Sequence, residues 1–168
     1  MDLMGTPTHP HTPDCAAASA GLPPVPATLP QWERAMQRAR AAGQMGQMAM
    51  ALAFEQQALA LALRLVQQTP PAGREDDCIA ALVVSHLNVA DLQVQAAEPD
   101  AAARLLGRAH GLLQSLVADG RCGAALRQAA WRHGRETHAA LLAHVRSHGP
   151  HPAIAQALAG GGLAGLSS

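Results

Sequence analysis

Apolar residues recur with the period of a helix in the middle of the chain. One stripe covers residues 102–117 and another covers residues 83–94, and both have apolar side chains at the spacing that places them on one helical face. Between the stripes, Glu98, Pro99 and Asp100 favour the start of a new helix, because proline suits the first turn and an acid suits its positive end. The pattern predicts a hairpin of two helices.

Three further segments have the same period, namely residues 31–43, 47–68 and 124–147. The segment 47–68 is apolar around much of its circumference, and such a helix is usually covered by neighbours on more than one side. We therefore expect it to be the central helix in a stack of about five antiparallel helices.

Both ends of the chain lack this pattern. Residues 1–30 hold seven of the twelve prolines, a composition that does not bury enough apolar surface to offset the entropy of ordering. At the other end, Pro150, Pro152 and a run of glycines interrupt regular structure. The sequence predicts a disordered proline-rich arm over 1–30, a helical domain over 31–148 and a flexible tail over 149–168.

The composition favours an all-α fold. Good helix formers dominate, whereas the chain has no tyrosine and a single phenylalanine, so residues that favour strands are scarce. All twelve basic residues are arginine, a bias typical of GC-rich bacterial genomes. Twelve acidic residues balance them, so no bulk positive charge attracts the phosphates of nucleic acids.

The sequence has neither the pattern of an export signal nor that of a membrane helix. The N-terminal region lacks a positive stretch followed by an apolar run. The most apolar stretch, residues 45–66, is interrupted by Glu55, Arg64 and several glutamines. The three cysteines are far apart and include no C-x-x-C pair. We expect a cytoplasmic protein that has no disulfide framework and does not bind membranes.

Two sets of alanines have identical spacing in the first and the second hairpin. The sets, each with steps of twelve and seven residues, are Ala39, Ala51 and Ala58, and Ala90, Ala102 and Ala109. Small residues at such points let helices cross closely. The pattern resembles the tetratricopeptide repeat (TPR), in which a small residue on one helix is followed by two alanines on the next. Ala39 and Ala90 are 51 residues apart, whereas the repeats of that family recur at about 34 residues.

This resemblance implies a non-enzymatic protein–protein interaction module, such as an adaptor, chaperone or assembly factor. Proteins of this class bind a peptide or helix on the concave surface formed by the first helix of each repeat, and residues 124–147 would extend that surface. The partner is expected to be another protein, and a homodimer is left open. The partner-binding residues that the mapping implies are Gln37, Arg40, Leu87, Asn88, Asp91, Arg127, Trp131 and Arg135. Tryptophan and arginine are common at binding hot spots, although Trp131 could instead pack under a tail.

A metal-binding accessory protein is the alternative function. The chain has nine histidines and six methionines, and His144 and His148 are one helical turn apart, with His151 close beyond. Methionines at residues 45–50 offer thioethers suited to Cu(I). Against this, no set has the spacing of a closed zinc site, and methionine at helical spacing is usually a core residue. We expect neither a metal nor another cofactor.

The sequence contains no catalytic signature. A Gly-rich phosphate loop, a G-x-S-x-G elbow and an HExxH helix are all missing. Cys78 and His86 lie two turns apart, but a small buried thiol usually has only a packing role. His86 and His110 are expected to be hydrogen-bonded packing residues. The sequence therefore predicts no enzymatic activity.

Overall fold

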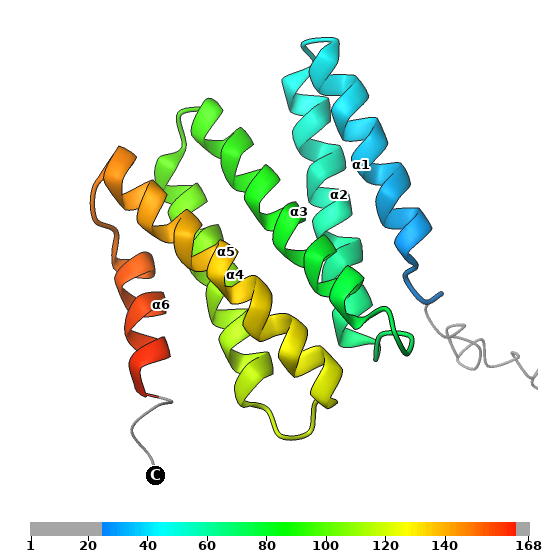
Figure 1. The fold of residues 1–168 in the computed structure, drawn as a ribbon. Coiled ribbons are helices and arrows are strands. Elements are labelled where there is room, and N and C mark those ends of the chain that lie inside the picture. Colours follow the sequence, from blue (N-terminus) through cyan, green and yellow to red (C-terminus); the bar gives the residue numbers. More distant parts are fainter. Residues whose placement is uncertain (1–24, 164–168) are drawn as a thin grey trace, which may run out of the picture.

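The computed structural model describes residues 25–163, with side chains up to residue 160, and all regular structure in this range is helical (Figure 1). Its helices are α1 (Leu29–Gln44), α2 (Met48–Gln67), α3 (Glu75–Gln95), α4 (Pro99–Ala118), α5 (Ala124–His148) and α6 (Pro152–Leu163). The predicted all-α fold is confirmed.

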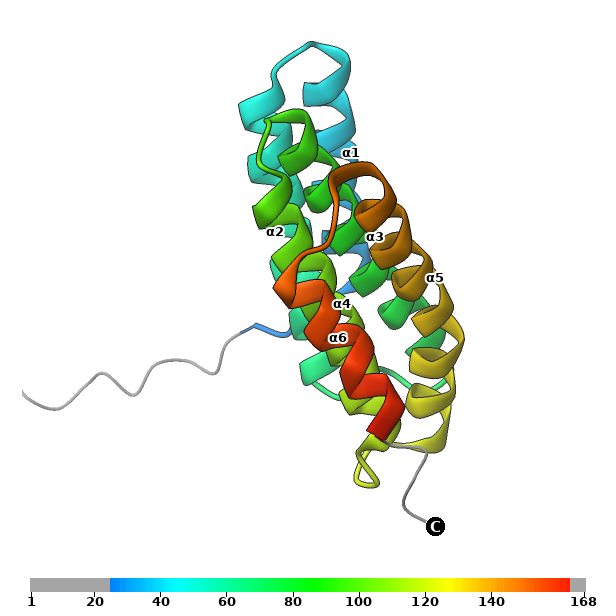
Figure 2. The ribbon, with the colours of Figure 1, turned by 90° about the vertical axis from the view of Figure 1, so that its left-hand side faces the viewer.

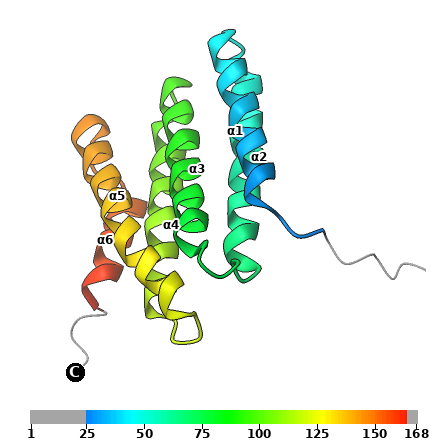
Figure 3. The ribbon, with the colours of Figure 1, turned by 45° about the vertical axis from the view of Figure 1, so that its right-hand side comes forward.

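The helices stand side by side as three antiparallel pairs, with α1, α3 and α5 in front of α2, α4 and α6 (Figure 3). α3 lies in the middle and packs against α2, α4 and α5. α6 packs mainly on α4 and touches α5 only slightly. Figure 2 shows α6 running along α4, with α5 to one side. The last pair is therefore splayed, whereas the first two are closed hairpins.

α3 is the most buried helix. Nine of its residues are buried, compared with five in α2. The prediction that the helix over 47–68 is central is therefore wrong. α2 packs mainly against α1 and α3, whereas α3 packs against three helices, so α3 buries more of its circumference.

The alanines of the two matching sets are all buried, with at most 3% of each exposed. Because alanine carries only a methyl group, these positions let neighbouring helices approach closely. Larger side chains then join the pairs to one another. Trp32 of α1, for example, donates a hydrogen bond from Nε1 to the buried Ser85 Oγ of α3, at 2.8 Å.

α1 begins earlier than expected. The Thr28 hydroxyl accepts a hydrogen bond from the Gln31 N–H, and the Gln31 side chain accepts one from the Thr28 N–H, which together form a capping box. The Gln68 side chain also exchanges two hydrogen bonds with the Ala27 backbone, which ties this segment to the end of α2. Residues 25–30 thus belong to the helical domain, and the remainder of the predicted arm, residues 1–24, lies outside the described residues.

The flexible tail predicted over 149–168 is wrong for residues 152–163, which form α6, and its last residues, 164–168, lie outside the described residues. His151 begins the helix: its Nδ1 accepts a hydrogen bond from the Ala153 N–H at 3.1 Å, and Pro152 occupies the first turn, where its missing N–H costs nothing. Ile154 is 1% exposed and packs in a cluster with residues of α3, α4 and α5. This packing outweighs the low helix propensity of the glycines near the end of α6.

α2 and α3 are long and apolar enough to cross a membrane by length and composition alone. The α2 segment passes this criterion, contrary to the sequence-based expectation, because Glu55 and Arg64 are its only charged residues. Half of the most apolar window of α3 is buried within the fold, compared with 28% for α2. The core helices of folded proteins have the same apolar composition. For α3, burial within the fold accounts for this composition.

Gly107 is predicted to be essential for the packing of α6 against α4. A Cβ atom at this position would lie 2.9 Å from the backbone oxygen of Ala153. Gly107→Ala should therefore push α6 away from α4 and cost about 1–3 kcal/mol of unfolding free energy, measured by urea denaturation. Amide hydrogen exchange in α6 should rise.

Gly111→Ala is the matched control, because a Cβ atom there meets nothing within 4 Å. It should gain up to about 1 kcal/mol from helix propensity. Equal stabilities for the two variants would contradict the close approach of α4 and α6.

Candidate functional site

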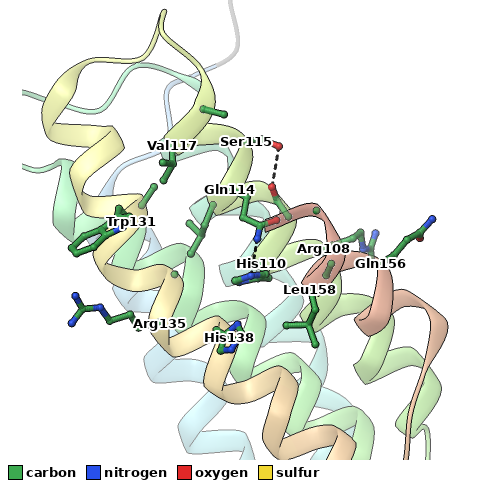
Figure 4. A pocket seen from close by; sticks show the side chains of 18 of the residues that line it. Arg108, His110, Gln114, Ser115, Val117, Trp131, Arg135, His138, Gln156 and Leu158 are labelled. Carbon is green, nitrogen blue, oxygen red and sulfur yellow. Dashed lines mark hydrogen bonds between the residues drawn. The ribbon is translucent and has the colours of Figure 1, made fainter. Parts of the chain in front are cut away.

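A large hollow lies between α4, α5 and α6 and has a volume of about 1360 Å³. It exists because α5 and α6 both pack on α4 but diverge from each other after the turn at Gly149. The surface of α4 between them is left uncovered (Figure 4).

The interior of the hollow is partly apolar. Its aliphatic lining residues are Leu113, Val117, Ala118, Ala130, Ala153, Ala157 and Leu158. Two lining glycines, Gly111 of α4 and Gly134 of α5, have nothing within 4 Å of the position of a Cβ atom. The missing side chains at these positions increase the depth of the hollow.

His110 is the central polar group of the interior, and its hydrogen bonds define its tautomer. Thr137 Oγ1 donates to the Gly134 carbonyl, so it must accept from His110 Nδ1, which lies 2.8 Å away. The other ring nitrogen, Nε2, then accepts from the Gln114 side-chain amide at 2.9 Å. His110 is thus neutral, with its proton on Nδ1. Burial lowers the pKa of His110, and the neighbouring charge of His138 lowers it further.

Trp131 and Arg135 form the outer edge of the hollow on α5. The Arg135 guanidinium stacks over the Trp131 ring at 4.8 Å from the centroid, and Trp131 is 56% exposed. In Figure 4 both side chains lie on the side of α5 away from α6, whereas His138 points toward Leu158. An exposed tryptophan beside an arginine is a combination found at binding hot spots.

The hollow is lined by one sign of formal charge. Its lining includes Arg104, Arg108, Arg127 and Arg135, and neither aspartate nor glutamate occurs among the described residues that line it. Because the whole chain has a formal net charge of zero, this positive charge is a local feature. It favours an anionic ligand.

A second and smaller cavity, of about 200 Å³, lies between α1, α2 and α3. Its polar lining residues are Glu55, Asn88 and Asp91. Asn88 Nδ2 donates to Glu55 Oε1 at 3.2 Å, while Glu55 Oε2 is buried and has no hydrogen-bond partner among the described residues. Burial raises the pKa of Glu55, against the opposing effects of Asn88 and Arg40.

The structure distributes the eight predicted site residues over different surfaces. Arg127, Trp131 and Arg135 border the large hollow, and Asn88 and Asp91 border the small cavity. The other three, Gln37, Arg40 and Leu87, line neither of the two.

Gln37 and Arg40 are exposed on α1, and Leu87 packs against core residues. The eight residues are therefore not gathered in one groove, because α1 and α5 lie on opposite sides of α3 (Figure 1). Their role in partner binding stays a prediction.

Sequence reasoning misses Glu55, Gln114 and the α6 side of the large hollow. In the sequence, Glu55 stands out only as an interruption of an apolar helix, although a lone acid on such a helix is itself a signal of a buried polar site. The α6 side is missed because its prolines and glycines indicate a tail. The prediction that His86 and His110 are hydrogen-bonded packing residues is confirmed: both are buried, and His86 Nδ1 lies 2.7 Å from the Leu82 carbonyl.

The histidines and methionines of the alternative metal function do not converge on one point. The His144 and His148 rings stack with centroids 4.6 Å apart. Within residues 25–163, no group of three or more His, Cys, Asp or Glu side chains is placed to hold a metal ion. Met45, Met48 and Met50 are exposed rather than in the core. The arrangement gives the metal-binding function no geometric support.

Acid is predicted to destabilise the fold through its buried histidines. Burial lowers the pKa values of His86, His110 and His144, so below about pH 6.5 the unfolded chain binds protons that the folded chain does not. The unfolding free energy should therefore decrease from about pH 7.5 to about pH 5.5, measured by urea denaturation.

The raised pKa of Glu55 has the opposite effect on the pH dependence of stability. As the pH falls, the folded chain binds a proton at Glu55 before the unfolded chain does, and this stabilises the fold. Glu55→Gln should therefore steepen the acid destabilisation, and His110→Gln should reduce it. If the unfolding free energies of the wild type, Glu55→Gln and His110→Gln all stayed constant over this pH range, the assignment of neutral buried histidines would be contradicted.

Comparisons with known proteins give one family match. The model of the family described as "Protein of unknown function (DUF2753)" matches residues 30–164. No curated protein and no solved structure matches the chain. The matched range runs from the second residue of α1 through the whole of α6 and thus includes both cavities. The chain is therefore a member of the DUF2753 family.

Proposed function

We propose that this chain is a non-enzymatic protein-binding module of the cytoplasm, acting as an adaptor, chaperone or assembly factor, whose hollow between α4, α5 and α6 receives a helix of a partner protein. The observation that carries the proposal is the splayed last pair, which leaves a partly apolar face of α4 uncovered beside the exposed Trp131. Such a face buries apolar area when a partner covers it.

The size of the hollow suits a helix. A helix with side chains is about 10 Å across and rises about 1.5 Å per residue, so a hollow of about 1360 Å³ is large enough for a few helical turns. A helix inserted there would contact α4, α5 and α6 together. This is the helix-in-groove mode, in which apolar anchors at i, i+3, i+4 and i+7 enter a hydrophobic groove.

The charge of the hollow indicates the chemistry of that helix. Four arginines line the hollow, and no acid does so within the described residues, which is complementary to aspartate and glutamate on the partner. The aliphatic floor, including Leu113 and Leu158, favours an amphipathic helix over a nucleic acid. We therefore propose an acidic amphipathic helix as the occupant.

The proposed relation to tetratricopeptide repeats has one structural support. The six alanines with matching spacing are all buried, and they lie on corresponding helices of the first two pairs. Binding, rather than catalysis, is supported by His110, because both of its ring nitrogens are engaged by Thr137 and Gln114. A histidine held in this way is poorly placed to transfer a proton to a ligand.

The test is selection of binders from a displayed library of 15-residue peptides, with the intact chain as target. The proposal predicts enriched peptides with apolar residues at helical spacing and acidic residues between them. Gly134→Gln should abolish their binding, because a side chain there projects into open space of the hollow. The same change should keep or raise stability, by up to about 1 kcal/mol, because glycine is a poor helix former.

Gly43→Gln is the matched control, because Gly43 lies in α1, outside the large hollow, and a Cβ atom there meets nothing within 4 Å. It should leave peptide binding unchanged. Failure to enrich any peptide, or equal binding to Gly134→Gln, would overturn the assignment of the hollow as a docking site.

Trp131→Ala combined with Arg135→Ala should weaken binding of a selected peptide by at least about tenfold, measured by calorimetry, with helicity by circular dichroism unchanged. Arg146→Ala, on an exposed position of α5 outside the hollow, serves as the control. A double variant that binds as well as the wild type would exclude this edge from the docking site.

A further inference from the structure

The small cavity between α1, α2 and α3 has a feature that the fold itself does not explain. Glu55, on the apolar helix α2, is only 8% exposed, and its Oε2 atom is buried with no hydrogen-bond partner in the described part of the chain. A buried carboxylate oxygen without a donor destabilises a protein, and native structures rarely keep one without a role. Oε2 therefore lacks a donor that any of the described residues could supply.

The surroundings of Glu55 indicate which donor fits. Its Oε1 is held by Asn88 Nδ2, so the orientation of the carboxyl group is set, and Glu55, Asn88 and Asp91 all line the cavity. The remaining lining is small or apolar, namely Ala39, Gly43, Ala51 and Leu92. Two acids thus border a small space whose other lining residues, apart from Asn88, offer little polarity.

The charge of Arg40 on α1 acts on Glu55, and Asp91 on α3 is the second acid that lines the cavity. Arg40 is exposed and acts on Glu55 through its charge. The two acids and one arginine leave one uncompensated negative charge when both acids are ionised. A ligand with one positive charge balances it.

We propose that this cavity binds a primary ammonium group, which donates hydrogen bonds to Glu55 and Asp91. An ammonium group is a compact charge with three donors on an aliphatic stem, so it matches two carboxyl groups and small apolar walls. The volume of about 200 Å³ accommodates such a group with a short stem. The chain contains no lysine that could fill the cavity itself.

The proposal does not depend on the docking site between α4, α5 and α6. The two cavities lie on different helix sets and share no lining residue. One favours anions and the other a cation. Loss of either site leaves the other to be tested on the same protein.

The test is a titration of the full chain with n-butylammonium, followed by the NMR signals of the Asn88 side-chain amide. Binding should shift these signals in a saturable way. Glu55→Gln should weaken the affinity by about 10- to 100-fold, while Glu33→Gln, at an exposed position of α1, should leave it unchanged. The glutamine oxygen can still accept from Asn88, which preserves the local structure.

Two further measurements distinguish hydrogen-bonded ammonium binding from attraction of any cation to the two acids. Butyltrimethylammonium, which has the charge without N–H donors, should bind at least about tenfold more weakly. Arg40→Gln should strengthen the binding of n-butylammonium, because it removes a competing positive charge. Affinity should also fall as the pH is lowered, since burial raises the pKa of Glu55 and a proton then competes with the ligand.

A second probe, the blocked peptide acetyl-Gly-Lys-Gly-amide, identifies the source of the ammonium group. Tighter binding than n-butylammonium assigns the site to a lysine of a partner protein, and weaker binding assigns it to a free alkylamine. The proposal is overturned if no saturable shift occurs up to about 100 mM probe, if Glu55→Gln binds as well as the wild type, or if Mg²⁺ produces the same shifts.

Discussion

The contact between Gly107 of α4 and Ala153 of α6 determines the form of this protein. Because Gly107 has no side chain, the α6 backbone approaches α4 more closely than any other residue would allow. Ile154 completes the contact in the core shared by α3, α4 and α5. α6 is therefore held on α4 instead of against α5, and the uncovered α4 surface between the two helices becomes the large hollow.

The two cavities are lined by charged residues of opposite sign, although the formal net charge of the chain is zero. Arginines on α4 and α5 surround the large hollow, whereas Glu55 and Asp91 border the small one. Neither local excess of charge is visible in the overall composition, because the positive and negative charges cancel over the whole chain. Local charge, set by which helix faces meet, gives each cavity its own ligand preference.

Much of the fold can be predicted from the sequence, because helix formation here follows from local signals. The apolar periods and the turn at Glu98, Pro99 and Asp100 indicate the helices up to residue 148, and the buried alanines agree with their spacing. α6 is missed when prolines and glycines are treated as breakers, although Ile154, Ala157 and Leu158 have helical spacing. Pro152 stands at a helix start, where proline is favourable.

The sites are harder to predict than the helices, because they depend on which helices become neighbours. Trp131 and Arg135 are identified from their spacing and do border a hollow, but that hollow needs α6 as its other wall. The sequence marks Glu55 only as a lone acid on an apolar helix, whereas Asn88, which bonds its Oε1, and Asp91, which lines the same cavity, come from α3. Burial, and not residue type, distinguishes Glu55 from the exposed acids of the chain.

α6 rests on α4 and leaves the space beside α5 open. The most direct measurement is the distance between spin labels at Ala139 of α5 and Ala155 of α6, two exposed positions, by double electron–electron resonance. Cys15 and Cys122 would be replaced by serine, and the buried Cys78 retained. One narrow distribution at the separation seen in the structure is the predicted result. A shorter distance, with α6 closed against α5, would contradict the account.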